Sequence, residues 1–250
     1  MVTTLVTLLP SVVGVVVLTA LATGVLVAFR VHGPWSPATA IVRGALQLAV
    51  LSVILTGIIS SAVWIALALV VMFTVAATVA ARRIGWTVRT AGMTASSMAA
   101  GILLSLVVVF TTGALQLTPR YALAIGAIVI GNSMSIATLT GRHFVSGVRD
   151  RWDQVEGWLA LGATPRQSTL EQARRAVREA LVPTIDQTKT TGLVVLPGAF
   201  VGAIFGGISP LEAGRFQLVV LATIMAAGAI TSVLNVLWLG PVRTKPAAVR

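Results

Sequence analysis

Long runs of apolar residues, separated by short polar linkers, make up most of the 250-residue chain. The runs approach or reach the roughly 20 residues that a helix needs to cross a bilayer. Most linkers contain glycine, proline, serine or arginine, which are common where helices end. This pattern predicts an all-α polytopic membrane protein with seven transmembrane helices, at residues 5–29, 38–59, 62–81, 91–110, 121–139, 185–205 and 216–239.

Composition supports a membrane protein with one domain. Charged residues make up 10% of the chain and the mean hydropathy is +0.96, whereas soluble domains contain about 25% charged residues. The first run has no basic segment before it and is longer than the hydrophobic region of a signal peptide, so we expect a retained first span. The prediction is a single transmembrane domain over residues 1–250.

The stretch between the fifth and sixth predicted spans is polar and has helical periodicity. Its first part carries apolar residues three or four positions apart, namely Val145, Val148, Trp152, Val155 and Leu159. This spacing places all five on one face of a helix. The glycine that follows, Gly162, suits the C-terminal cap of that helix because glycine adopts a positive φ without strain.

A second helix is predicted to begin after Thr164. Pro165 suits the first helical position, and Gln167, three residues after Thr164, completes a capping box. The inward-facing residues of this helix are expected to be Leu170, Ala173, Val177 and Ala180. The two helices would form an amphipathic hairpin within residues 141–184, and a helix pair lying at the lipid interface is the alternative interpretation.

Basic residues define the expected orientation. If the N-terminus is outside, the inner loops hold 14 of the 18 basic residues: Arg30, Arg82, Arg83, Arg89, Arg142, Arg149, Arg151, Arg166, Arg174, Arg175, Arg178, Arg243, Lys245 and Arg250. The outer loops hold only Arg120 and Arg215. Because Lys and Arg concentrate in cytoplasmic loops, we expect an outer N-terminus, a cytoplasmic hairpin and a cytoplasmic C-terminus. The same rule explains the net charge of +11 without nucleic-acid binding.

Polar side chains inside apolar spans are costly and commonly functional. Five candidates for a transport path, or for its mouth, are Arg43, Gln47, Asn132, Asp186 and Lys189. Arg43 and Gln47 lie one turn apart on the second predicted span, and snorkelling to the interface explains Arg43 equally well. An interhelical hydrogen bond is the alternative role for Asn132.

The sixth predicted span is short and interrupted. Its uninterrupted apolar part, residues 192–205, has 14 residues, which is about 21 Å of helix against a bilayer core of about 30 Å. Pro197 breaks or kinks a helix, and Gly198, Gly202 and Gly206 form a G-x-x-x-G face that permits close helix contact. We favour a transport path at this break. A kinked packing helix at a dimer interface is the alternative.

Residues suited to catalysis are scarce. The chain has no cysteine, and its two histidines, His32 and His143, lie far apart in the sequence, so no metal centre is expected. Neither Lys189 nor Lys245 follows a glycine, so the chain has no P-loop for a nucleotide. We therefore expect a protein that is not an enzyme and that binds no cofactor itself.

Several short motifs together resemble the FetB-type ABC transporter permeases, a family of iron-export permeases that is also similar to the plant aluminium-tolerance permeases. They occur in the family's order and spacing: VRGALQL at 42–48, GNSM at 131–134, VEGWLALGAT at 155–164, LVPTIDQTKTTGLVVLPG at 181–198 and SPLEAGRFQ at 209–217. The resemblance covers roughly residues 40 to 235. It implies a homodimeric permease of the inner membrane that works with a separate ATP-binding subunit, which holds ATP and Mg.

The resemblance also assigns a role to the polar hairpin. EGWLALGATPRQ is similar to the E-A-A-x-x-x-G motif, a short cytoplasmic helix of ABC importer permeases that docks on the ATPase. It implies that the ATPase is contacted by Glu156, Leu161, Gly162 and Ala163. Gly157 and Trp158 replace the two alanines of the motif.

One departure from the family pattern concerns the cargo. After Pro197 the family has P-G-M-M-x-G-Q, whereas residues 197–203 of this chain lack both methionines and the glutamine. The predicted function is an exporter of iron or another metal, driven by a partner ATPase. The alternatives are an ABC permease for a small metabolite such as a nucleotide sugar, an ATP-independent channel or ion-coupled carrier with Asp186 and Lys189 as a relay, and an intramembrane scaffold without transport.

Overall fold

The computed structural model describes the backbone of residues 2–58 and 61–247 and the side chains of residues 9–52 and 61–247. All the regular structure of these residues is helical, apart from one isolated bridge between Thr191 and Val195. The all-α prediction is confirmed for this part of the chain. The chain divides into two compact units, Met1–Ser60 and Ser61–Arg250. The predicted end of the second span at residue 59, and Arg250, lie outside the described residues.

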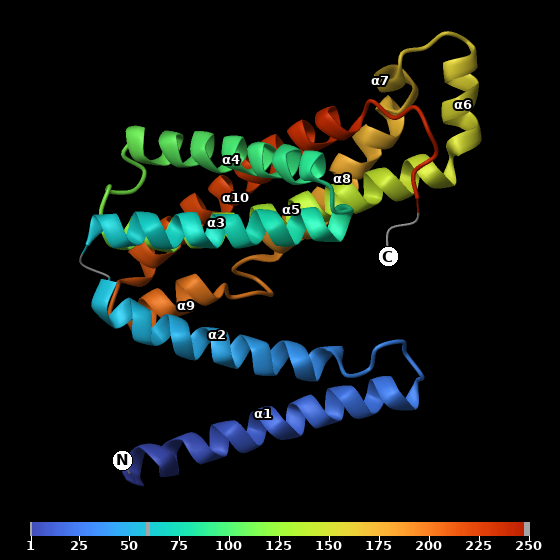
Figure 1. Ribbon diagram of the computed structural model, residues 1–250. Coiled ribbons are helices and arrows are strands. Elements are labelled where there is room, and N and C mark those ends of the chain that lie inside the picture. The colour runs from blue at the N-terminus through green and yellow to red at the C-terminus, as the bar shows by residue number, and fades with distance from the viewer. Residues whose placement is uncertain (1, 59–60, 248–250) are drawn as a thin grey trace. The chain divides into compact units, whose positions relative to one another are not determined.

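In the first unit, α1 (Val2–Ala28) and α2 (Ser36–Ile58) form a helical hairpin (Figure 1). The turn between them uses positive φ angles at Arg30 and Gly33. The described side chains of both helices are mostly exposed and apolar, as expected of helices that face lipid.

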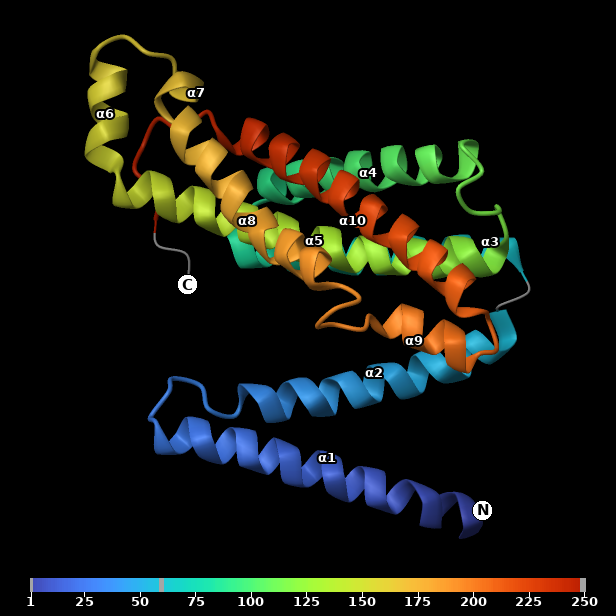
Figure 2. The same cartoon turned by 180° about the vertical axis from the view of Figure 1, so that it is seen from behind.

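The second unit is a bundle of long helices with shorter helices at its edge. Its helices are α3 (Ala62–Ile84), α4 (Val88–Thr111), α5 (Pro119–Asp150), α6 (Trp152–Ala160), α7 (Pro165–Ser168), α8 (Leu170–Thr190), α9 (Gly198–Phe205) and α10 (Pro210–Leu239). Figures 1 and 2 show α6 and α7 at one end of the bundle, and the α4–α5 and α9–α10 turns at the other end. The α3–α4 turn and the segment that follows α10, residues 240–247, lie at the same end as α6 and α7.

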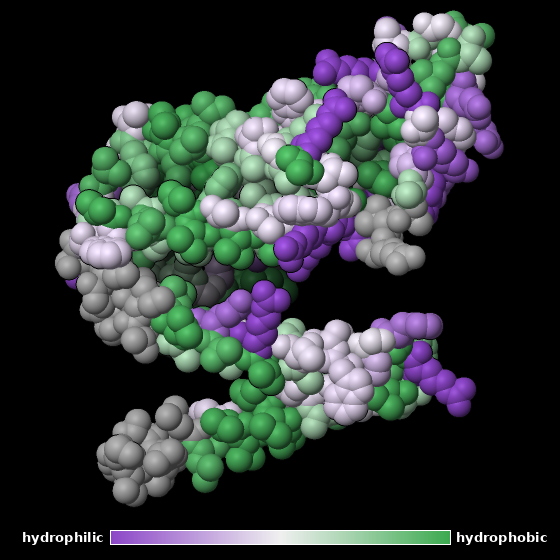
Figure 3. All heavy atoms as spheres, in the orientation of Figure 1, coloured by the Kyte–Doolittle hydropathy of each residue, from purple (hydrophilic) through white to green (hydrophobic). Residues whose placement is uncertain are grey.

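The surface of the molecule has the character of a membrane protein. Five helical segments among the described residues are long and apolar enough to cross a bilayer: Leu9–Ala28, Ala62–Ile84, Val88–Thr111, Pro119–Asp150 and Pro210–Leu239. At most 50% of each apolar window is buried within the chain. Hydrophobic atoms cover the bundle around α3 and α4, and hydrophilic atoms gather at the end with α6 and α7 (Figure 3). The protein is therefore a multi-pass membrane protein, and the count of seven spans stays a prediction.

Small residues let α10 lie close to α4 and α5. A Cβ atom added at Gly101 on α4 would collide with Thr231 Oγ1 and would lie 2.5 Å from the carbonyl oxygen of Ala227 on α10. On the other side, Asn235 Nδ2 on α10 donates a buried hydrogen bond of 3.1 Å to the carbonyl oxygen of Ala137 on α5. Close backbone approach and interhelical hydrogen bonds are the usual means of packing helices in lipid.

The predicted boundaries of the polar hairpin need correction. The apolar stripe from Val145 to Leu159 predicts one helix, but α5 continues without interruption to Asp150 and the helix breaks at Arg151, with φ −120° and ψ 33°. The apolar positions of that predicted stripe nevertheless meet in one cluster, which contains Val145, Val148, Trp152, Val155 and Leu159. In the second helix, Ala173, Val177 and Ala180 face inward, whereas Leu170 is 42% exposed. The expectation for Leu170 is wrong because α8 begins there, beyond the buried cap residue Thr169.

The sixth predicted span is not one helix. Residues 185–190 are the last turns of α8, residues 191–197 form a turn, and α9 has only 8 residues. An 8-residue helix rises about 12 Å, far less than the roughly 30 Å core of a bilayer. The interruption expected at Pro197 is therefore a full break in the helix.

Candidate functional site

The break between α8 and α9 is formed by local sequence. Gly192 adopts a φ of +86°, which glycine tolerates, and its N–H donates to the carbonyl oxygen of Val195 at 2.9 Å. The N–H of Val194 donates to the carbonyl oxygen of Thr190 at 2.9 Å. Pro197, which has no N–H to donate, is the N-cap of α9. The turn thus satisfies much of its own backbone and keeps the chain from continuing as a helix.

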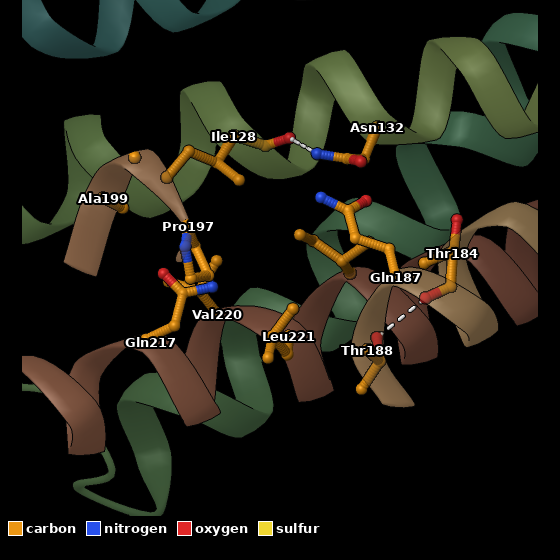
Figure 4. Close-up of a pocket in the computed structure, with 12 residues that line it drawn as sticks. Ile128, Asn132, Thr184, Gln187, Thr188, Pro197, Ala199, Gln217, Val220 and Leu221 are labelled. Atoms are coloured by element: carbon orange, nitrogen blue, oxygen red, sulfur yellow. Dashed lines mark hydrogen bonds between the residues drawn. The ribbon is translucent and has the colours of Figure 1, made fainter. Parts of the chain in front are cut away.

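A pocket of about 190 Å³ lies beside this break. Four helices and the turn form its walls: α5, α8, the start of α9, and α10 (Figure 4). The lining residues are Ile128, Asn132, Thr184, Gln187, Thr188, Pro197, Gly198, Ala199, Gln217, Val220, Leu221 and Ile224. We call this cavity the amide pocket, because three of its side chains are carboxamides and none is charged.

The three carboxamides come from different helices. Asn132 Nδ2 on α5 donates to the carbonyl oxygen of Ile128 at 2.8 Å, which fixes the side chain and leaves its oxygen available. Gln187 on α8 extends toward Asn132 across the pocket (Figure 4). Gln217 on α10 is only 6% exposed, and its Oε1 has no hydrogen-bond partner among the described residues. A buried carboxamide oxygen without a partner is costly for stability, and a water molecule or a ligand in the pocket could supply that partner.

The pocket separates the predicted path residues into two groups. Asn132 lines it, together with Pro197 and Gly198 of the predicted helix break. Asp186 and Lys189 do not line it, and instead pair with each other at 3.3 Å between Oδ1 and Nζ, with side chains 61% and 69% exposed.

Arg43 and Gln47 belong to the first unit. They lie one turn apart on α2, and both side chains are exposed within that unit.

The G-x-x-x-G face of α9 makes no close contact within the described part of the second unit. Apart from the neighbouring residues and backbone of α9 itself, no described atom of this unit lies within 4 Å of a Cβ placed at Gly198 or Gly202, and the nearest atoms to a Cβ at Gly206 are carbonyl oxygens of α9. Close packing through glycine occurs instead at Gly101. The packing role predicted for the α9 glycines stays a prediction.

The segment from α6 to α8 contains the predicted coupling residues. Gly162 has a φ of +89° after α6, and Thr164 forms the expected capping box, with its N–H donating to Gln167 Oε1 at 2.9 Å and its Oγ1 accepting from the Gln167 N–H. Both cap predictions are confirmed. Ala163, between them, is half-buried.

The short helix α6 has one buried and one exposed face. Val155 is fully buried in the cluster with Trp152 and Leu159, which anchors the helix to the ends of α5, α8 and α10. The opposite face exposes Glu156, Trp158 and Leu161, the last being 83% exposed. A rigid helix with an exposed acid and two exposed large apolar side chains is a surface suited to a protein partner.

Helix α8 connects the region around α6 and α7 with the amide pocket. Near its middle, Glu179 lies 3.4 Å from His143 Nδ1 on α5 and accepts a 2.7 Å hydrogen bond from Arg175 Nε. The hydrogen bond from Arg175 lowers the pKa of Glu179 against a smaller opposing effect of burial, and the charges of Arg175, His143 and Arg151 lower it further. Two turns farther along the same helix lie Gln187 and Thr188 of the amide pocket.

Sequence reasoning missed two of the three carboxamides. Gln217 is the last residue of the SPLEAGRFQ motif, and it is polar where the last apolar run begins. Gln187 stands between Thr184 and Lys189 in a row of polar residues, where nothing in the pattern distinguishes it from its neighbours. Among the described residues, no group of three or more His, Asp or Glu side chains is arranged to hold a metal ion.

Comparison with known proteins identifies the family of the chain. A family model described as the uncharacterised protein family UPF0014 matches residues 9–241. The chain belongs to the UPF0014 family. This confirms the resemblance inferred from the short motifs, because the relatives of this chain include a FetB protein and the plant proteins STAR2 and ALUMINUM SENSITIVE 3.

Three relatives illustrate the range of the family. The UPF0014 membrane protein STAR2 of Oryza sativa subsp. japonica is 39% identical over 198 residues, which cover 78% of this chain and 70% of the relative. Protein ALUMINUM SENSITIVE 3 of Arabidopsis thaliana is 36% identical over 193 residues, 76% of this chain and 71% of the relative. The probable iron export permease protein FetB of Escherichia coli strain K12 is 33% identical over 140 residues, 56% of this chain and 53% of the relative. No solved structure matches the chain.

Proposed function

We propose that the chain is the membrane-spanning permease subunit of an ABC transporter that exports iron or another metal, with a separate subunit supplying ATP hydrolysis. The observation that carries the proposal is the amide pocket at the α8–α9 break. Irregular backbone at membrane depth is tolerated where it is buried in protein or lines a cavity, and transporters place their substrate sites at such broken helices.

The position of helix α8 suggests how ATP hydrolysis on the partner subunit could act on the amide pocket. It begins beside α6 and α7 and ends at the amide pocket, so a movement of its first turns is transmitted to Thr184, Gln187 and Thr188. The exposed face of α6, with Glu156 and Leu161, would bind the ATPase. ATP and Mg would stay on that partner, since the sequence has no P-loop.

The charge distribution of the second unit supports the proposed orientation. Apart from Lys189 at the break, its basic residues within positions 61–247 lie at the end with α6, except for Arg120 and Arg215 at the opposite end. Under the positive-inside rule, the end with α6 faces the cytoplasm of the cell whose plasma membrane holds the protein. We propose that the working unit is a homodimer, as the resemblance to ABC permeases implies.

The chemistry of the amide pocket limits how a metal could pass. Neutral carboxamides contribute oxygen ligands, but multivalent cations are usually bound with carboxylates. A metal would therefore cross this pocket with ligands of its own. The name of the E. coli relative, probable iron export permease protein, supports iron as the first cargo to test.

Co-purification and reconstituted transport test the proposal. The chain, tagged at its C-terminus, is co-expressed with an ATP-binding cassette subunit from its own genome and extracted in mild detergent. An equal amount of that subunit in the purified complex, and ATP-dependent movement of ferric citrate by proteoliposomes, would support it. A chain that purifies alone and moves no cargo with ATP would contradict it and favour the ion-coupled carrier.

A further inference from the structure

A second and larger cavity opens at the end of the bundle opposite α6. It has a volume of about 640 Å³ and lies between the α4–α5 turn, the first turns of α5 and α10, and the end of α9. Its polar lining residues are Gln116, Thr118, Arg120, Tyr121, Glu212 and Arg215. We call this cavity the vestibule.

The vestibule and the amide pocket are lined by the same three helices. Each helix gives one residue to each cavity, and the two residues are four positions apart: Ile128 and Ala124 on α5, Ala199 and Ala203 on α9, and Gln217 and Ala213 on α10. Within the vestibule, the rings of Tyr121 and Phe216 pack with 5.7 Å between their centroids. The shared walls make the vestibule the natural continuation of any path that passes the amide pocket.

The vestibule contains the two arginines of the second unit that the positive-inside rule does not explain. In the proposed orientation this is the outer end of the second unit, where basic residues are disfavoured. The two that are present there, Arg120 and Arg215, both line this one cavity. Their convergence at a single place is therefore better explained by a ligand than by membrane topology.

Neither guanidinium is neutralised within the described structure. No ion pair joins Arg120 or Arg215 to a carboxylate among the described residues. Glu212, the one acid of the vestibule, accepts a hydrogen bond from Ser209 Oγ at 3.1 Å as part of the cap of α10. The cavity therefore keeps a net positive charge, and planar guanidinium groups suit the paired oxygens of carboxylate or phosphate.

We propose that the vestibule is a binding site for soluble oxyanions, and that Arg120 and Arg215 hold carboxylate or phosphate groups carried by the cargo before its release. The role in release rests on the proposed permease function. The site accounts for a metal that crosses the uncharged amide pocket together with its own ligands, because the negative groups of such a complex would meet the two arginines next.

The only tyrosine of the chain gives a direct probe, because Tyr121 lines the vestibule. The full chain, labelled with 3-fluorotyrosine and held in nanodiscs of zwitterionic lipid, should give one ¹⁹F resonance. Citrate and inorganic phosphate are titrated separately, and chloride at matched ionic strength is the control. Native protein, the Arg120→Gln/Arg215→Gln double variant and Arg89→Gln, which changes a basic residue at the opposite end, are compared.

A saturable shift with citrate or phosphate in native protein and in Arg89→Gln, with apparent affinity at least about tenfold weaker in the double variant, supports the site. The absence of a shift, or a shift that survives the double substitution, overturns it. A shift caused by anionic phosphatidylglycerol in the nanodisc but by neither soluble anion also overturns it, since the arginines would then bind lipid headgroups. Transport in proteoliposomes is measured in parallel, so that saturable binding without ATP-driven transport would count against the permease and leave the binding site standing.

Discussion

His143 Nδ1 on α5 lies 3.4 Å from Glu179 Oε2 on α8, and the other oxygen of the same carboxylate accepts a hydrogen bond from Arg175. This cluster holds α8 against α5 between the exposed face of α6 and the amide pocket. Ala173 and Ala176 are buried in the turns of α8 just before it. The ion cluster and the small buried residues together keep α8 in register with α5.

The cluster should make stability depend on pH in acid. The hydrogen bond from Arg175 lowers the pKa of Glu179 in the folded protein, below the roughly 4.3 expected of an unfolded chain. The stabilisation is therefore complete above about pH 4.3 and is lost as the pH falls through the lower folded value. Because the pair is exposed, the effect should be small.

Melting temperatures of detergent-solubilised protein between pH 7 and pH 3 measure this effect. Glu179→Gln should flatten the acid part of the curve relative to native protein. Glu171→Gln is the matched control on the same helix, α8, and should change the curve less. It removes a carboxylate that lies 3.9 Å from the guanidinium of Arg151. If the melting temperature depended on pH in the same way for native protein and Glu179→Gln, the Glu179 carboxylate would not be the source of the acid sensitivity.

Gln217→Leu should separate function from stability. The substitution removes a buried carboxamide oxygen without a partner, so the melting temperature should stay level or rise, by the equivalent of about 1 kcal/mol. Transport should fall at least tenfold, because the pocket loses a hydrogen-bonding group. Thr223→Val on the same helix is the control: its hydroxyl donates to the carbonyl oxygen of Val219 and does not line the pocket. Full transport by Gln217→Leu would show that the amide pocket is not on the path.

Glu156→Lys should weaken binding of the ATPase while leaving the fold intact, since Glu156 is exposed on α6. Asp153→Lys makes the same change of charge on the same helix and is also exposed, outside the proposed contact. Quantitative co-purification with the ATP-binding subunit should show a clear loss for Glu156→Lys and little loss for Asp153→Lys. Equal retention of the subunit by the two variants would remove Glu156 from the interface.

Gly101→Ala should destabilise the bundle, by about 1–3 kcal/mol if α4 and α10 separate to admit the methyl group. Gly92→Ala, on the same helix, has no atom within 4 Å of the new Cβ and should be neutral or stabilising by up to about 1 kcal/mol. Thermal unfolding of both variants in one detergent tests the difference. A melting temperature for Gly101→Ala equal to that of native protein would mean that the helices do not cross so closely.

Much of the fold follows from the hydropathy pattern. Residues 62–81, 91–110 and 216–239 lie within α3, α4 and α10, because long apolar runs between capping residues specify a helix almost by themselves. The caps at Gly162 and Thr164 were also predictable, since each depends on one residue and its close neighbours. The end of α5 was not predictable, because no glycine or proline marks the break at Arg151.

The amide pocket was predictable only in part. Asn132 and Pro197 stand out in sequence because each is unusual within an apolar run. Gln187 and Gln217 gain their significance from tertiary packing, which joins α8 and α10 beside α5. The charged candidates on α8, Asp186 and Lys189, pair with each other three residues apart, and periodicity does not separate such a local ion pair from a functional charge.

A single introduced cysteine tests the central claim most directly, because the chain has no cysteine of its own. Ala199→Cys places a thiol in the amide pocket, and Val63→Cys, at a position 77% exposed on the apolar surface of α3, is the lipid-facing control. Both are assembled with the ATPase in proteoliposomes and treated with a membrane-impermeant maleimide. We predict that the thiol at 199 reacts, that its rate changes when ATP is hydrolysed, and that the thiol at 63 stays unreactive. A thiol at 199 that is unreactive, or that reacts at the same rate with and without ATP, would contradict a transport path through the amide pocket.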